Sequence, residues 1–135
     1  MNRREEREQA FLLLFETAFD ESREATEVYE TAKEARDLED SAYIHRVLSG
    51  VAKHKAELDE MIAAHSHGWN RERISATAAA AMLLAVYEMK YCEDIPVRVS
   101  LNEAIELMKK YDEDKARVFV NGVLNAIAKE LEAKG

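Results

Sequence analysis

The single proline of this chain, Pro96, is the residue that most constrains what the chain can fold into. Proline fixes its own φ angle, lacks a backbone N–H and pushes the preceding residue away from the helical region. We therefore expect one helix to end near Cys92 and another to begin just beyond Val97. Ser100 and Glu103 form an S-x-x-E capping box, a pattern typical of a helix N-terminus.

Apolar residues after Pro96 recur at the i, i+3, i+4, i+7 spacing of a buried helical face. One set precedes the charged break K-K-Y-D-E-D-K and a second set follows it: Leu101, Ala104, Ile105 and Met108, then Val120, Val123, Leu124, Ile127 and Leu131. Two such helices joined by a short polar turn form an antiparallel hairpin. This hairpin needs the rest of the chain to cover its apolar faces.

Four further helices are expected before this hairpin, over about residues 3–19, 21–40, 42–65 and 74–91. One face of the first helix carries Ala10, Phe11, Leu14, Phe15 and Ala18. The fourth helix, with Ser75 as its N-cap, is apolar almost all the way round, so we expect it to be the central helix. Between the third and fourth helices, Gly68 reads as a helix stop and Trp69 as a core or hinge anchor.

Length and composition favour one all-helical domain. The chain has 135 residues but only four glycines and one proline, which leaves little turn chemistry. One cysteine permits no internal disulfide and fits a reducing cytoplasm. The N-terminus is charged from residue 3, and the longest apolar run, residues 76–86, is too short to span a bilayer. We expect a soluble cytoplasmic protein without a signal peptide.

The net charge of −8 is unevenly distributed along the chain. Residues 16–40 carry ten acidic and three basic residues, a net charge of −7, so the remainder carries about −1. We read this acidic run as a solvated helix face. Because salt screens charges beyond roughly 8–10 Å, basic groups elsewhere keep their potential at short range.

Three arginines stand at the start of the first helix, in R-R-E-E-R-E. Arg3 and Arg7 are four residues apart and share a helical side, with Arg4 beside them. Two interpretations remain open from spacing alone. One is a solvated, salt-bridged first turn. The other is an arginine-rich grip on RNA, in which planar guanidinium groups bind backbone phosphates.

Sequence patterns of catalysis and metal binding are absent. The chain has no glycine-rich phosphate loop, no G-x-S-x-G, no H-E-x-x-H and no zinc-ligand spacing. Cys92 reads as a small buried side chain, and His65 and His67 lie far from it in sequence. We therefore expect a non-enzymatic protein that needs no metal and no cofactor.

Several motifs together resemble one known family. The segments V-Y-E-M-K-Y, I-P-V-R-V, N-E-A-I-E-L and F-V-N-G-V-L, with the opening R-R-E-E-R-E-Q-A-F, resemble the NusB family of bacterial transcription antitermination factors over the whole chain. The resemblance implies an all-α fold of two packed, perpendicular three-helix bundles with about six to seven helices. It implies one domain with an N-terminal half, 1–70, and a C-terminal half, 71–135.

The function that this resemblance implies is RNA binding without catalysis. NusB proteins bind the single-stranded boxA element of nascent ribosomal RNA leader transcripts together with NusE, a small-subunit ribosomal protein, in an RNA polymerase antitermination complex. By position, Arg3, Arg4 and Arg7 match the family's RNA-binding arginines. Phe15 falls near the family's NusE surface.

A second set of positions flanks the family's RNA site. Lys115 and Arg117, in K-A-R-V-F, are further candidates for phosphate contacts. Tyr111 and Phe119 are candidates for stacking on bases, with core packing as the other reading of Phe119. At this turn Asp112 stands where the family usually has a helix-ending glycine, Lys115 where it has an acid and Val118 where it has a lysine. The basic character there is therefore rearranged.

The fourth helix departs from the family's usual residues at two positions, and two rival functions are considered. Ala78 and Leu83 stand where the family usually has an acid and an arginine, which implies weaker NusE binding or apolar surface that a homodimer covers. A helical protein–protein adaptor without an RNA role is one rival, favoured by the acidic residues 16–40. The RNA-binding module of an rRNA cytosine methyltransferase is another, and the lack of a methyltransferase domain in these 135 residues distinguishes it.

Overall fold

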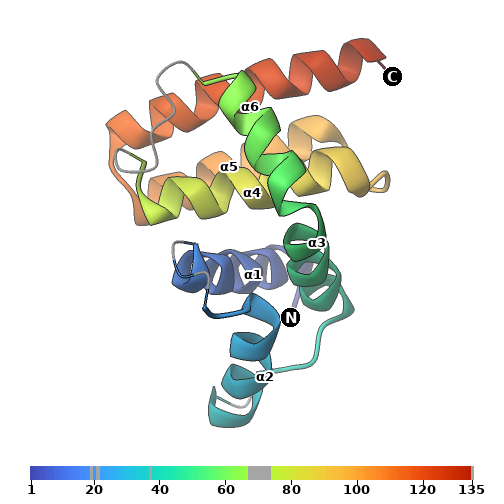
Figure 1. The fold of residues 1–135 in the computed structure, drawn as a ribbon, viewed down its shortest axis with the longest axis vertical. Helices are drawn as coiled ribbons and strands as arrows, with labels where there is room; N and C mark the ends of the chain where they lie inside the picture. Colours follow the sequence, from blue (N-terminus) through green and yellow to red (C-terminus); the bar gives the residue numbers. More distant parts are fainter. Residues whose placement is uncertain (19, 21, 37, 67–73, 135) are drawn as a thin grey trace.

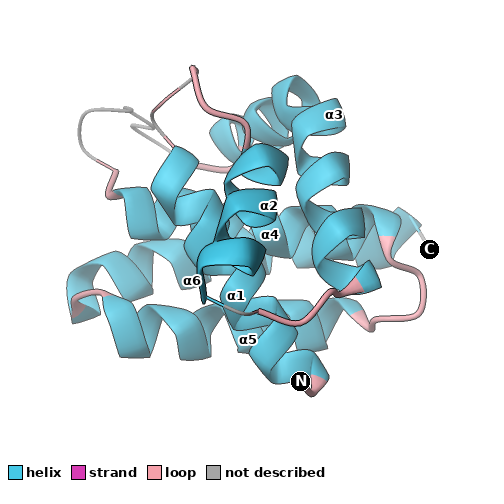
Figure 2. Cartoon of the chain, turned by 90° about the horizontal axis from the view of Figure 1, so that it is seen from below, coloured by secondary structure: helices cyan, strands magenta, loops and turns pink. Residues whose placement is uncertain are grey.

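The structure, a computed structural model, describes residues 1–18, 20, 22–36, 38–66 and 74–134. All regular structure in these ranges is helical, as the composition predicted (Figure 2). The six helices are α1 (Arg3–Thr17), α2 (Ala25–Arg36), α3 (Ala42–Ala64), α4 (Ala76–Tyr91), α5 (Val97–Tyr111) and α6 (Asp114–Lys134).

The helices form an N-terminal set and a C-terminal set that α3 connects (Figure 1). The first half of α3 lies beside α1 and α2, and its second half crosses toward α4 and α6. This arrangement confirms the predicted fold class. The predicted boundary at residue 70 falls outside the described residues, as do His67, Gly68 and Trp69, so the division into halves stays a prediction.

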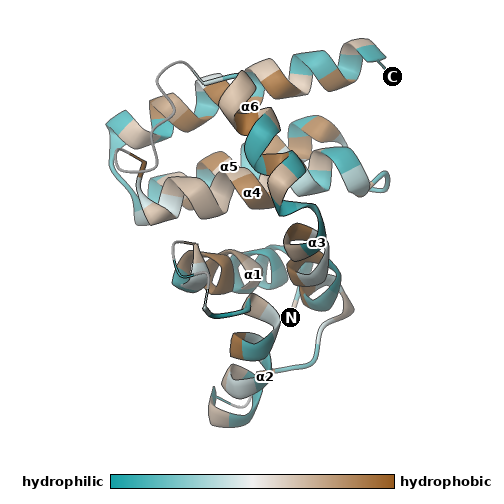
Figure 3. Cartoon of the chain, viewed as in Figure 1, coloured by the Kyte–Doolittle hydropathy of each residue, from teal (hydrophilic) through white to brown (hydrophobic). Residues whose placement is uncertain are grey.

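The central helix is α4, as its sequence predicted. It contacts α1, α3, α5 and α6, and its side chains are buried around nearly the whole circumference. The small side chains of the run from Ala78 to Ala81 let neighbouring backbones approach closely, and Figure 3 shows the apolar character of α4 between its neighbours. Ser75 caps the helix, because its Oγ accepts a hydrogen bond from the backbone N–H of Ala78 at 3.0 Å.

Pro96 separates α4 from α5, but the predicted capping box is wrong. The N-cap of α5 is Pro96 itself, with no side-chain cap, and the helix begins at Val97. The backbone N–H groups of Val99 and Ser100 already donate to the Pro96 carbonyl. Ser100 therefore lies within the first turn, is buried, and has a different partner, described below.

The apolar positions predicted for α1, α5 and α6 lie on the core side, where Ile105 and Leu131 are partly buried, and one position is exposed. Phe11 and Leu14 of α1, Leu101 and Met108 of α5, and Leu124 of α6 are all buried. Phe15 differs, because 43% of its surface is exposed, so it lies at the edge of the α1 stripe. Within the described residues no helix is long and apolar enough to cross a membrane.

The end of α5 departs from the family pattern at Asp112, and α2 is shorter than predicted. Asp112 follows α5 with φ −140°, an extended conformation that does not require the glycine common in the family. Its Oδ2 accepts a hydrogen bond from the Ser75 hydroxyl at 2.6 Å and so ties the end of α5 to the start of α4. The helix predicted over residues 21–40 is shorter, Ala25–Arg36, and buries Tyr29 and Ala32.

Two helical glycines give opposite expectations for stability. A Cβ at Gly50 of α3 would overlap the buried Tyr87 ring, whereas nothing lies within 4 Å of a Cβ at Gly122 of α6. Gly50→Ala should therefore lower the free energy of unfolding by about 1–3 kcal/mol through overpacking. Gly122→Ala should raise it by roughly 0.5–1 kcal/mol, because alanine has the higher helix propensity.

Urea denaturation of the two variants measures both effects. If Gly50→Ala stabilises the protein as much as Gly122→Ala does, the close packing of Tyr87 on α3 is contradicted.

Candidate nucleic-acid interface

The three arginines at the start of α1 have different environments. Asn2 caps the helix and accepts a hydrogen bond from the backbone N–H of Glu5. Arg4 is 74% exposed, and Arg3 is about half exposed, with its guanidinium 4.4 Å from the centre of the Tyr43 ring. Arg7 is only 6% exposed. The structure therefore brings Arg3 and Arg4 to the surface and turns Arg7 into the interior.

Arg7 belongs to a buried polar cluster around Glu88 of α4. Its Nε donates to Oε2 of Glu88 at 2.9 Å, and the Tyr43 hydroxyl donates to the same oxygen. The Ser100 hydroxyl donates to Oε1 at 2.9 Å. Four helices, α1, α3, α4 and α5, thus meet at one carboxylate whose two oxygens are both hydrogen-bonded.

The electrostatics of this cluster are those of a compensated buried ion pair. Burial by itself lowers the pKa of Arg7, but the charge of Glu88 and its hydrogen bond raise it above the ordinary value. Burial, followed by the Glu88 carboxylate, raises the pKa of Tyr43, so this hydroxyl stays protonated and donates. A buried charge is tolerated only when it is paired and hydrogen-bonded, and here both conditions hold.

A cleft of about 370 Å³, lined by cations and carboxylates, lies between α1 and α5. The lining residues from α1 are Arg4, Arg7 and Glu8, and those from α5 are Glu103, Glu106, Leu107, Lys109 and Lys110. The Arg4 Nη2 lies 2.9 Å from the Glu103 carboxylate, and the Lys110 Nζ lies 2.6 Å from that of Glu8. The exposed arginine of α1 therefore shares its surface with two lysines of α5.

An aromatic edge continues this surface. Tyr111 at the end of α5 donates its hydroxyl hydrogen bond to Glu8, and its ring centre lies 5.4 Å from that of Phe11. Phe11, Phe15 and Tyr111 border a small hollow of about 90 Å³ together with Leu12 and Thr77. The predicted residue Phe15 thus lies beside the partly exposed ring of Tyr111.

The two other predicted basic residues lie on the first turn of α6. Lys115 is exposed and lines a different cleft from Arg4, together with Ser75, Ala78 and Phe119. Arg117 is partly buried and pairs with Asp114, its Nη2 lying 3.3 Å from the carboxylate. Phe119 packs against the core with part of its surface open.

Ala78 and Leu83 do not leave apolar surface uncovered. They are 2% and 5% exposed, because the neighbouring helices cover α4 at both positions. The inference that a homodimer closes extra apolar surface here is therefore wrong.

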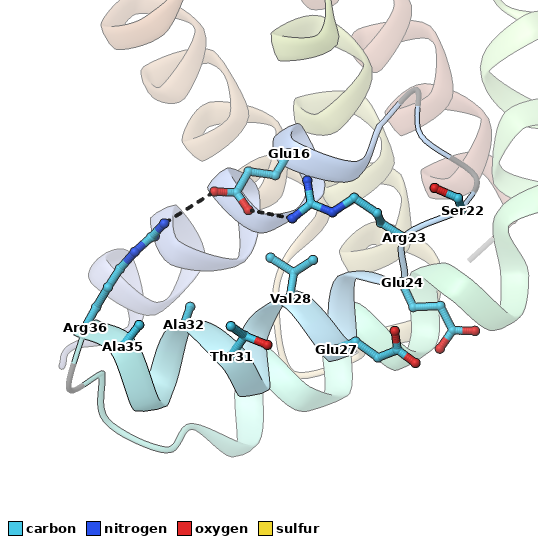
Figure 4. A pocket seen from close by; sticks show the side chains of 10 residues that line it. All are labelled: Glu16, Ser22, Arg23, Glu24, Glu27, Val28, Thr31, Ala32, Ala35 and Arg36. Atoms are coloured by element: carbon cyan, nitrogen blue, oxygen red, sulfur yellow. Dashed lines mark ion pairs between the residues drawn. The ribbon is translucent and has the colours of Figure 1, made fainter.

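The acidic segment contributes a contact between α2 and α1 (Figure 4). Arg36 and Arg23 both approach the Glu16 carboxylate, with nitrogen–oxygen distances of 3.6 and 4.0 Å. The apolar side chains of Val28, Ala32 and Ala35 lie beneath them in the same pocket. These pairs connect α2 and the turn before it to the end of α1.

Sequence reasoning missed the partner of Arg7 and the lysines of the cleft. Glu88 is the only acidic residue in α4, and a lone carboxylate in an apolar helix signals a buried cation elsewhere. Lys109 and Lys110 occupy the last turn of α5, where basic residues are common because they complement the helix dipole. Their position gave no sign that α1 lies alongside.

The Glu88 cluster predicts how single substitutions affect stability. Arg7→Met should lower the free energy of unfolding by about 3–5 kcal/mol, because it leaves a buried carboxylate without its cation. Arg4→Met, the control at an exposed position, should change it by no more than about 0.5 kcal/mol.

A double-mutant cycle by urea denaturation adds Glu88→Met and the Arg7→Met/Glu88→Met pair. The pair should cost less than the sum of its single variants by about 1 kcal/mol or more. Equal, small costs for Arg7→Met and Arg4→Met would contradict the buried pair.

Comparisons with known proteins agree with this architecture. The model of the NusB family matches residues 4–129. The transcription antitermination protein NusB of Bacillus subtilis (strain 168) is 45% identical over 133 residues, which cover 98% of both chains.

Two solved structures are also similar. NusB of T. maritima superposes with a TM-score of 0.83 at 29% identity, covering 96% of this chain and 92% of the other. A crystal structure of the antitermination factors NusB and NusE in complex with dsRNA gives a TM-score of 0.82 at 26% identity, covering 95% and 96%. Because the family model matches residues 4–129 and the Bacillus subtilis relative aligns over 98% of both chains, this chain belongs to the NusB family.

Proposed function

We propose that this chain is a non-enzymatic transcription antitermination factor. In this proposal it binds the boxA element of nascent rRNA leader transcripts together with NusE and acts in the cytoplasm within an RNA polymerase antitermination complex. The name of the Bacillus subtilis relative supports the antitermination role. The similar complex of NusB, NusE and dsRNA supports RNA and NusE as the partners.

The observation that carries the proposal is the pair of exposed arginines at the start of α1. Arg3 and Arg4 present guanidinium groups to solvent, where they bind phosphates and release counterions. This contribution depends on salt and tolerates many sequences. In the proposal Arg7 has an indirect role, because its buried pairing with Glu88 fixes the position of α1, the helix that carries Arg3 and Arg4.

Further RNA contacts are proposed on α6 and at the end of α5, and a NusE contact is proposed on α1. Lys115 is exposed and is proposed as a further phosphate contact, with Arg117 beside it. Tyr111, whose ring is partly exposed, is the better placed of the two candidates for stacking on an unpaired base, since Phe119 packs largely against the core. Phe15 is proposed as a contact for NusE, because it is a large apolar side chain exposed on α1.

Fluorescence anisotropy with labelled boxA RNA and a scrambled RNA, with and without NusE and at two salt concentrations, tests this function. Arg3→Ala/Arg4→Ala should weaken binding and flatten the dependence of log K on log salt by about 1.4, since each lost phosphate contact on a single strand removes about 0.7. Arg23→Ala/Arg36→Ala, an equal loss of charge near α2, should bind like the wild type.

Two results would contradict the proposal in different ways. If the Arg3/Arg4 variant binds like the wild type, these arginines are not the phosphate contacts. If the wild type binds boxA no better than scrambled RNA, with or without NusE, the adaptor function replaces RNA recognition.

A further inference from the structure

The cleft between α1 and α5 has an uneven arrangement of charge. Arg4 is 74% exposed above Glu103, which is 17% exposed. Lys110 is 59% exposed above Glu8, which is 25% exposed. In both pairs the cation lies toward solvent and the carboxylate lies deeper, so an anion that approaches Arg4 or Lys110 meets the cation before its carboxylate. The third pair of the cleft differs, because Glu106 is 59% exposed and Lys109 is 49% exposed.

The cations of the cleft come from both helices. Lys109, about half exposed, lies one residue before Lys110 and pairs with Glu106 at 3.3 Å. Lys109 and Lys110 follow each other at the end of α5, and Tyr111 comes next with part of its ring open to solvent. Two exposed lysines and a partly exposed aromatic ring are therefore adjacent at the end of α5.

Resting on the function proposed above, we propose that this cleft extends the RNA-binding surface. Lys109 and Lys110 contact RNA phosphates together with Arg4, and the deeper carboxylates of Glu8 and Glu103 limit affinity because they compete with phosphate for the same cations. Binding is then an exchange of carboxylate for phosphate at a surface that is electrically balanced before RNA arrives.

Physical reasons make this exchange feasible. Exposed ion pairs contribute little to stability, so their cations are available to a stronger anion. A phosphate held by several cations also releases its counterions, which favours binding at low salt. Hydrogen bonds from Lys110 and Tyr111 keep the pKa of Glu8 below its ordinary value, so this carboxylate stays ionised and the competition persists at neutral pH.

The balance predicts opposite effects for lysine and glutamate substitutions. Lys109→Gln/Lys110→Gln should weaken boxA RNA binding about tenfold and flatten the salt dependence by about 1.4. Glu103→Gln should tighten binding about threefold or more, because a negative charge close to the incoming phosphate is removed.

Matched controls change the same charges elsewhere. Lys53→Gln/Lys129→Gln alters two exposed lysines of α3 and α6, and Glu34→Gln alters an exposed acid of α2. Both should bind within about twofold of the wild type, since exposed charges beyond a Debye length of about 8–10 Å are screened. Fluorescence anisotropy at two salt concentrations measures all variants, and circular dichroism verifies that each remains helical.

The outcomes separate this inference from the function on which it rests. If the wild type does not bind RNA, the proposed function fails and the cleft fails with it. If the wild type binds but the Lys109/Lys110 variant behaves like its control, the cleft is not part of the RNA surface, while the contacts of Arg3 and Arg4 stand. If Glu103→Gln weakens binding, Glu103 positions Arg4 and does not compete with phosphate, which overturns the exchange.

Discussion

The carboxylate of Glu88 is the interaction on which the relative placement of the helices depends. It accepts hydrogen bonds from Arg7 of α1, Tyr43 of α3 and Ser100 of α5 while its own helix, α4, lies at the centre of the fold. An apolar core tolerates small shifts of its helices, because dispersion contacts are not directional. A buried charge with three fixed donors tolerates them far less, since any shift leaves a charged oxygen unsatisfied.

The same cluster links the interior of the protein to its surface. One turn before Arg7, the side chains of Arg3 and Arg4 face solvent, so the pairing of Arg7 with Glu88 sets how α1 presents them. The α1 helix also lies against the end of α5 through the contacts of Glu8 with Lys110 and Tyr111. The basic surface is therefore assembled from two helices that are distant in sequence.

Periodicity predicted all six helices, and Pro96 located the break between α4 and α5, because these signals are local. The predicted capping box is wrong because Pro96, with an extended ψ, is already the N-cap of α5. The Ser100 hydroxyl does not cap the helix and instead donates a hydrogen bond to Glu88. The spacing of Arg3 and Arg7 correctly predicted that the two side chains share one face of α1, since both lie near the Tyr43 ring. It did not predict that Arg7 is buried while Arg3 is about half exposed. Burial depends on the partner 81 residues away, which local spacing does not reveal.

Family resemblance supplied the candidate residues, and the structure assigns them different surroundings. Lys109 and Lys110 escaped notice because two lysines at a helix end are ordinary until another helix brings an arginine beside them. The pairing of cations with deeper carboxylates is likewise a tertiary feature. The sequence alone does not reveal which residues of α1 lie beside which residues of α5, because long-range packing sets that alignment.

The most direct test of the central claim follows the arginine Nε–Hε signals by NMR during titration with boxA RNA. We expect the Arg7 signal to exchange slowly with solvent and to keep its position, since its Nε donates to the buried Glu88. The signals of Arg3 and Arg4 should exchange rapidly and shift as RNA binds. An Arg7 signal that exchanges as fast as that of Arg4, or that shifts as far on RNA addition, would contradict the structural role of the Arg7–Glu88 pair.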